Sequence, residues 1–390
     1  MKILIVHQHF RTPEQGGSIR SYHLARELSQ LGNKVCVITS SQILNEETKF
    51  EDFEVQYLKI NYDNSFGFIR RMISYSRFLI KTINSLKFYR NYDVCYVMST
   101  PLSVGIVGLW AKRFHKIPFV FEVGDLWPDI PIQMKIVRNP IFKRSVLKLE
   151  KIIYSKSALI VALSNEMMEL IQSKVKGKPI TVIENFADTG FFTNKIEGSE
   201  ISSAIKKGDF VISYIGTIGI ANKVESLVKL GKVLKEEAIT IVIKGRGKEL
   251  NLCKRLAKKS NLDNVIFLPF GSKEETRELL VYTDAIYVSF DKRFPLLTTG
   301  CPNKFIDGFA AGKIVLMNYG GWQKELVEKA GCGMIMDSDN PDDCLHKVRT
   351  ILLDPVQREK LKYSSRMLAQ RFEVKLLVQR LNLEISKILN

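Results

Sequence analysis

The chain has no cysteine pattern of the kind that stabilises small secreted or zinc-binding proteins. Its 390 residues include six cysteines, at positions 36, 95, 253, 301, 332 and 344, with no C-x-x-C pair and no zinc-finger spacing among them. This pattern excludes a disulfide framework as the basis of the fold. It predicts reduced, mostly buried thiols in a cytosolic protein.

The sequence also lacks a segment suited to membrane insertion. The first ten residues, MKILIVHQHF, have neither the long apolar core nor the cleavage site of a signal peptide. The stretch 94–111 is uncharged, but polar residues and a proline at 99–103 interrupt it. We therefore predict a strand at 93–98, a loop and a buried helix at 102–113 in place of a membrane-spanning helix.

Basic residues outnumber acidic residues in the chain. The chain has 58 Lys and Arg residues against 41 Asp and Glu residues, a net charge of +17. Such a field favours anionic partners, namely nucleic acid, anionic membranes or phosphorylated small molecules. The charge alone does not choose among them, but the sequence contains no recognisable nucleic-acid-binding module, so we expect no nucleic-acid partner.

Short apolar runs alternate with helical patterns along the chain. In the first half, the predicted strands are 3–6, 35–39, 55–60, 94–98, 119–123, 159–163 and 180–183. In the second half, they are 211–214, 239–243, 265–268, 285–289, 314–317 and 334–336. This alternation predicts parallel sheets covered by helices on both faces. The expected fold class is α/β, with two Rossmann-like domains facing each other across a cleft.

Breaks in the pattern give the predicted domain boundaries. An N-terminal domain is expected at 1–193 and a C-terminal domain at 209–370, because the alternation stops between them. The charged stretch 194–208 is interpreted as a linker. A C-terminal helix at 371–390 is expected to return to the N-terminal domain.

Two loops in the first half carry candidate functional residues. Gly16 and Gly17 follow the first strand and precede a helix, where backbone N–H groups and the helix N-terminus can hold an anion. Their spacing is not G-x-G-x-x-G, and an ordinary turn is the alternative. In FEVGDLWPD, a strand ends beside Glu122, Asp125 and Asp129, and a carboxylate there can accept a proton or bind a sugar hydroxyl. A solvated turn is the alternative.

Basic residues follow successive strands of the second half. Lys223 follows the first of these strands, and Arg246 follows the second, where both could stabilise a departing diphosphate. Each could equally be a solvated surface charge. The acidic triplet 337–339 resembles a metal ligand set, but we interpret it as a turn, and we predict no metal site.

The segment TTGCPNKFIDGFAAGK contains a second cluster of candidates. Pro302 is placed to start a helix, with Asn303 and Lys304 in the first turn and Asp307 one turn later. A cation is disfavoured near a helix N-terminus, and a bound phosphate would offset that cost. Asp307 can accept two hydrogen bonds, which suits a ribose diol. The alternative is a plain surface helix.

The segment Phe66–Tyr92 has basic residues and no acid. We predict a basic amphipathic helix that binds an anionic membrane surface, with a solvated face of the domain as the alternative. Its cations are Arg70, Arg71, Arg77, Lys81, Lys87 and Arg90. Four apolar residues are expected apart from these cations: Met72, Ile73, Ile80 and Ile83.

Taken together, the motifs resemble the retaining GT-B glycosyltransferases of family 4 over nearly the whole chain. The resemblance is closest to bacterial members that transfer N-acetylated aminosugars in surface-polysaccharide synthesis. It rests on HQHFRTPEQGGSIRSYHLARELSQLGNKVCVIT, on DLWP after a strand and on PNKFIDGFAAGK. It implies that Gly16 and Gly17 close on the donor diphosphate. Asp125 would contact the reacting sugar and acceptor, with Arg20 and Glu122 as less specific candidates beside them.

The same resemblance implies a donor site with two departures from the family pattern. Asp307 stands where the family holds the ribose. Thr299 occupies the place of the family's first glutamate, and Thr217 occupies the place of its usual arginine. The donor diphosphate and sugar would then depend on the remaining candidates: Lys223, Arg246, Pro302, Asn303 and Lys304.

The resulting prediction is an enzyme that moves a sugar from a UDP-sugar to a hydroxyl of a glycan or polyprenyl-linked acceptor, with retention of configuration. No metal and no cofactor are implied. The expected location is the cytoplasmic face of the cell membrane. Three alternatives stay open: a nucleotide-sugar 2-epimerase, a nucleic-acid-binding or other anion-binding protein, and a catalytically idle scaffold. Epimerisation of the donor without acceptor would favour the first.

Overall fold

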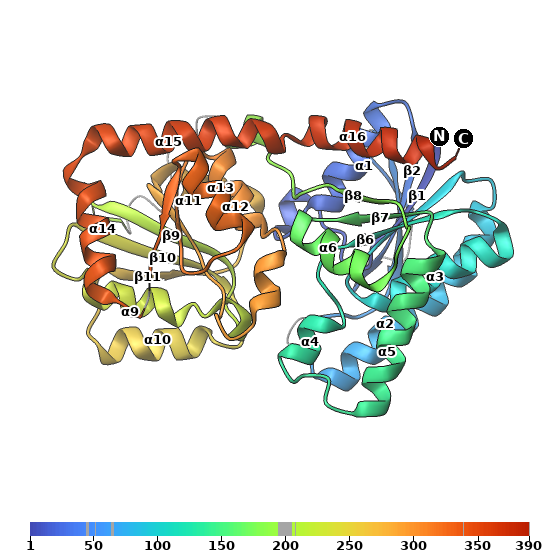
Figure 1. Ribbon diagram of the computed structural model, residues 1–390, viewed down its shortest axis with the longest axis horizontal. Coiled ribbons are helices and arrows are strands. Elements are labelled where there is room, and N and C mark those ends of the chain that lie inside the picture. The colour runs from blue at the N-terminus through green and yellow to red at the C-terminus, as the bar shows by residue number, and fades with distance from the viewer. Residues whose placement is uncertain are drawn as a thin grey trace. The chain divides into compact units, whose positions relative to one another are not determined.

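The computed structural model describes residues 1–43, 47–50, 52–63, 66–193, 205–206, 208–337 and 339–389. Contacts divide the chain into two units (Figure 1). The first unit contains Met1–Arg11, Ser18–Glu184 and Val374–Asn390, and the second contains Thr12–Gly17 and Asn185–Glu373. Most of the predicted linker 194–208 lies outside the described residues.

The first unit is built on a sheet in the order β3-β4-β2-β1-β5-β6-β7-β8. Its strands are β1 (Lys2–Val6), β2 (Lys34–Ser41), β3 (Glu47–Lys49), β4 (Glu54–Lys59), β5 (Val94–Met98), β6 (Phe119–Val123), β7 (Leu159–Ala162) and β8 (Ile180–Val182). All pairings are parallel except that of β3 with β4. The central strands are buried on both faces, which is why they appear in the sequence as continuous apolar runs.

Helices cover this sheet (Figure 1). They are α1 (Arg20–Gln30), α2 (Phe68–Ser85), α3 (Gly105–Trp110), α4 (Asp129–Gln133), α5 (Pro140–Lys156), α6 (Asn165–Lys174) and α16 (Val374–Lys387). Helix α16 packs on α1, and Asn33 Nδ2 donates to Asn382 Oδ1 at 3.0 Å. The last helix thus shares the core of the first unit.

The predicted helix at 102–113 is not a single α-helix. A 3-10 turn (Leu102–Val104) leads into α3, which continues as a π-helical turn at Ala111–His115. The helix packs closely on β6. A Cβ added to Gly108 would lie only 2.4 Å from the Phe119 side chain. Among the described residues, no helix is long and apolar enough to span a bilayer.

The second unit contains a six-stranded parallel sheet in the order β11-β10-β9-β12-β13-β14. Its strands are β9 (Phe210–Thr217), β10 (Ile239–Arg246), β11 (Val265–Leu268), β12 (Ala285–Val288), β13 (Ile314–Met317) and β14 (Gly333–Ile335). Its helices are α7 (Thr189–Thr193), α9 (Glu225–Val233), α10 (Leu250–Lys259), α11 (Lys273–Tyr282), α12 (Asn303–Ala310), α13 (Trp322–Ala330), α14 (Pro341–Leu353) and α15 (Pro355–Ala369). Both sheets thus confirm the predicted parallel α/β class.

Candidate active site

The second sheet reverses its strand order between β9 and β12. In doubly wound sheets, ligands bind beyond the carboxyl ends of the strands at such a switch point. The short helix Ile220–Asn222 follows β9, and α12 follows β12, so both elements lie beside this point.

Lys304, in the first turn of α12, places an ammonium group at the switch point. Its Nζ donates to the Tyr214 hydroxyl at 2.8 Å and to Asn222 Oδ1 at 3.1 Å. It also lies 4.1 Å from the centroid of the Tyr214 ring. These contacts connect α12 to β9 and its loop, and burial lowers the pKa of Lys304 to about 7.

Lys304 differs from three other lysines at this edge of the sheet. Each of those has a carboxylate partner at 2.7–2.8 Å: Lys244 with Glu275, Lys273 with Asp307, and Lys292 with Asp337. Within the described part of the chain, Lys304 forms no ion pair, and its two hydrogen-bond partners are neutral. A partly buried ammonium without a counter-ion is costly, so this position favours an anionic ligand.

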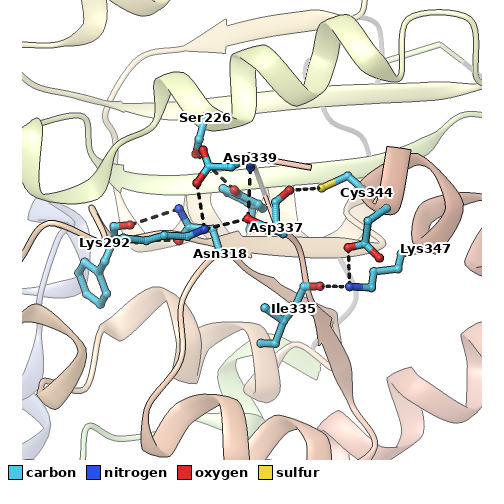
Figure 2. Close-up of polar contacts among 11 residues, drawn as sticks. Ser226, Lys292, Asn318, Ile335, Asp337, Asp339, Cys344 and Lys347 are labelled. Carbon is cyan, nitrogen blue, oxygen red and sulfur yellow. Dashed lines mark hydrogen bonds and ion pairs between the residues drawn. The ribbon is translucent and has the colours of Figure 1, made fainter. Parts of the chain in front are cut away.

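The pairing of Lys292 is drawn in Figure 2. This lysine follows β12, and its Nζ lies 2.8 Å from Asp337 and 3.1 Å from Asp339, in the turn after β14. The middle residue of the acidic triplet, Ser338, lies outside the described residues. No group of three or more His, Cys, Asp or Glu side chains in the described ranges is arranged to hold a metal ion.

Asp307 lies one turn after Lys304 on α12. Its Oδ2 accepts from Lys273 Nζ at 2.7 Å, and both side chains are largely buried. Burial raises the pKa of Asp307, and the charge of Lys273 opposes this shift. A carboxylate has more lone pairs than one lysine uses, so Asp307 can still accept a ligand hydroxyl.

We expect Asp307→Asn to weaken UDP binding by about 1.5–3 kcal/mol, the scale of a hydrogen bond to a charged group. The amide is preferred to Asp307→Ala, which would leave Lys273 buried without a partner and cost about 3–5 kcal/mol of stability. Calorimetric titration with UDP measures the effect, and Glu275→Gln, which removes the partner of Lys244, is the control. Unchanged affinity in a folded Asp307→Asn variant would remove Asp307 from the site.

The other predicted donor residues lie on the same unit. Helix α12 begins at Asn303, directly after Pro302. The Thr299 hydroxyl donates to the Leu296 carbonyl at 2.8 Å. Two basic residues lie at strand ends. Lys223 follows the short helix after β9 and has a left-handed backbone, with φ 43°. Arg246 is the exposed last residue of β10, and its guanidinium lies 4.4 Å from the centroid of the Phe270 ring.

The glycine loop also groups with the second unit. Gly16 and Gly17 have φ values of 66° and 84°, in the region that favours glycine. A Cβ on Gly16 would lie 2.0 Å from the Gly271 carbonyl oxygen, just before α11. Only glycine fits there, and the Gly16 N–H donates to the Pro13 carbonyl at 3.1 Å within the same loop.

In the first unit, Asp125 lies in the loop after β6, and its side chain is exposed. Two hydrogen bonds hold the backbone on either side of it. Gly124 N donates to Ser99 Oγ at 3.1 Å, and Trp127 N donates to the Asp125 carbonyl at 2.7 Å. The loop therefore presents a carboxylate beyond a strand end, as the sequence predicts.

Arg20 and Glu122, predicted near the acceptor, lie in the interior of the first unit. Their side chains are 6% and 1% exposed and form a bidentate ion pair, with both N···O distances 2.9 Å. Glu122 also accepts from the Tyr96 hydroxyl at 2.6 Å. Because both side chains are buried and paired with each other, they are placed to stabilise the surrounding loops and not to contact a ligand.

The family of the chain follows from two sequence matches. Residues 15–191 match the model of Glycosyltransferase Family 4, and residues 196–367 match that of Glycosyl transferases group 1. Together these matches cover most of the chain, so the protein is a family 4 glycosyltransferase. No curated protein matches the sequence.

Solved structures agree on the fold. The chain superposes on sucrose-phosphate synthase from Thermosynechococcus elongatus with a TM-score of 0.79 and 15% identity, covering 99% of this chain and 98% of that one. The HepE protein of Anabaena, solved with UDP-glucose, gives 0.72 and 17%, covering 99% and 100%. WaaG, a glycosyltransferase involved in lipopolysaccharide biosynthesis, gives 0.69 and 14%, covering 97% and 98%. The fold is therefore GT-B.

Proposed function

We propose that the protein transfers a sugar, an N-acetylated hexosamine, from a UDP-sugar to a hydroxyl of a glycan or polyprenyl-linked acceptor. The observation that carries this proposal is Lys304, a partly buried ammonium at the switch point that has no carboxylate partner among the described residues. The HepE structures with UDP and UDP-glucose support a nucleotide-sugar donor. The role of WaaG supports a place in surface-polysaccharide synthesis, as in capsule, O-antigen or exopolysaccharide.

In the proposed reaction, the bond between the anomeric carbon and the diphosphate oxygen breaks while the acceptor oxygen bonds to the same face of that carbon. The acceptor proton passes to an oxygen of the departing diphosphate. Lys304, with Lys223 and Arg246, would stabilise the charge that develops on the leaving group. Asp307 would hold the ribose, and Asp125 would orient the reacting sugar and acceptor hydroxyl.

A panel of nucleotide sugars tests this function. Because a ligand that binds only the folded state raises the melting temperature, the true donor should stabilise the protein most. The selected donor should then yield a glycosylated acceptor with the donor's anomeric configuration. Epimerised donor in the absence of acceptor, or an inverted product, would contradict the proposal.

We also propose that α2 contacts an anionic membrane, where a lipid-linked acceptor would be found. The helix buries one face through Ser74, Phe78 and Thr82. Its opposite face is apolar and exposed: Ile69, Ile73 and Ile80 are 73%, 47% and 59% exposed. Exposed cations flank this stripe: Arg70, Arg77 and Lys81. Apolar residues beside cations are typical of helices that lie in a membrane interface.

The membrane contact predicts a specific effect of charge removal. Changing Arg70, Arg77 and Lys81 to Gln should lower binding to anionic vesicles roughly a hundredfold, because each cation contributes about 1 kcal/mol near such a surface. Co-sedimentation at low salt measures this effect. The control changes Lys254, Arg255 and Lys258 of α10, three exposed cations on a helix without exposed large apolar residues, and should pellet like wild type. Equal binding of both variants would show that α2 is not the contact.

A further inference from the structure

The buried guanidinium of Arg20 connects three parts of the first unit. Its Nε and Nη2 donate to the two carboxylate oxygens of Glu122 on β6. Nη2 also donates to the Ile183 carbonyl at 3.0 Å, and Nη1 donates to the Glu184 carbonyl at 2.6 Å. One side chain therefore fixes the start of α1, strand β6 and the backbone after β8.

Each of these parts lies next to a segment of the proposed site or to the point where the chain leaves the first unit. Arg20 opens α1 three residues after Gly17, the end of the glycine loop. Glu122 precedes Asp125 by three residues on the strand that leads into its loop. Glu184 is the last residue of the first unit before the chain enters the second at Asn185. A shift of the guanidinium would therefore move the start of α1, the strand that leads into the Asp125 loop and the last residues of the first unit.

Other contacts keep the network in one arrangement. The Tyr96 hydroxyl on β5 donates to Glu122 Oε2, so the carboxylate has donors from both α1 and β5. At the crossover, Arg380 on α16 lies 3.1 Å from the Glu184 carboxylate. Buried charge pairs with several hydrogen bonds are strongly coupled, and removing one member leaves the other uncompensated.

We infer that Arg20 and Glu122 form a positioning pair that holds strand β6, and with it the Asp125 loop, against the start of α1 and the backbone after β8. Neither group needs to touch a substrate. The inference deepens the proposed function, because it assigns these two residues to the geometry of the same site. It distinguishes them from Lys304, Asp307 and Asp125, which we propose as ligand-contacting residues.

A double-mutant cycle tests the pair. Arg20→Lys and Glu122→Gln should each lower kcat at least tenfold with the selected donor, and the double variant should be no worse than the worse single variant, since both act through one network. The control is Lys362→Met, which breaks the Lys362–Asp284 ion pair (2.8 Å) in the second unit and should leave kcat unchanged. A loss confined to Arg20→Lys would assign Arg20 to ligand contact, and unchanged kcat in both single variants would leave only a structural pair. Either result overturns the inference.

A second readout does not depend on activity. In Arg20→Lys, amide hydrogen exchange should accelerate at least tenfold in three segments of the first unit, 18–20, 124–128 and 183–184, relative to strands of the second sheet. Lys362→Met should leave these segments unchanged. Uniform acceleration across the first unit would overturn the inference. A wild-type protein without transferase activity would contradict the proposed function and leave this exchange test in force.

Discussion

Replacement of Lys304 by methionine is expected to weaken binding of the sugar-nucleotide donor by about 1.5–3 kcal/mol, roughly ten- to a hundredfold or slightly more. Methionine keeps a long, flexible side chain of similar reach and removes the ammonium. The fold should be retained, because the Lys304 contacts go to neutral groups that water or neighbouring residues can satisfy. Calorimetric titration with the donor measures the loss.

Lys292→Met is the matched control for this substitution. Lys292 lies at the same edge of the same sheet, but two carboxylates already neutralise its charge. Loss of the Lys292 ammonium should leave donor affinity within about twofold of wild type, because that group is bound by Asp337 and Asp339 and not by the donor. The lost surface ion pairs should cost the fold only about 1 kcal/mol or less. Equal losses in both variants would show that the general positive field, and not a specific diphosphate contact, determines affinity.

The lowered pKa of Lys304 also predicts how donor affinity depends on pH. A bound diphosphate favours the ammonium form, so binding raises a pKa that is about 7 in the free protein. Donor affinity should therefore be constant below about pH 7 and fall as the pH rises above it, by up to tenfold per unit. The intact nucleotide sugar is the right probe, because UDP itself has a phosphate that titrates near about pH 6. The variant Lys304→Arg stays charged over this pH range, so its donor affinity should not decline. If that variant shows the same decline, the titrating group is not Lys304.

The sequence predicts most of the fold because both sheets are buried on two faces. Continuous apolar runs locate β5, β6, β11 and β13 to the residue. Strand β3 escapes prediction because Glu-Thr-Lys is a short polar edge strand whose pairing with β4, not its composition, makes it a strand. The helix after β5 begins with a 3-10 turn at Leu102–Val104 and ends in a π-helical turn at Ala111–His115, and local propensity predicts neither turn.

Residue positions in the site are also predictable, but their partners are not. The PNK segment gives the place of Lys304 at a helix start. Its neutral environment depends on Tyr214 and Asn222, which are 90 and 82 residues away. Likewise, Glu122 is predicted as a strand-end carboxylate, and only the fold shows that Arg20, 102 residues away, neutralises it in the interior. Long-range pairing decides which charges remain available to a ligand.

Asp125→Asn is expected to lower turnover at least tenfold, about 1.4 kcal/mol of activation free energy, while leaving donor affinity close to wild type. The amide keeps the size and shape of the side chain and removes the negative charge. Because the Asp125 side chain is exposed and the loop is held by backbone groups, the substitution should not disturb the fold. Donor affinity should persist because the proposed diphosphate and ribose contacts belong to the second unit.

Asp129→Asn is the matched control, four residues along the same loop. Its carboxylate is bound by the Lys174 ammonium, which also pairs with Glu150, so its charge is already committed within the protein. This variant should keep nearly full turnover. Transfer rates at saturating donor separate turnover from binding, because the loss of an interaction formed only in the transition state lowers kcat without raising KM. Near-normal turnover in Asp125→Asn would leave that carboxylate only a structural part in its loop. Equal losses in both variants would assign the effect to the acidity of the loop as a whole. A selective loss at Asp125 would place the reacting centre beside the strand end of β6.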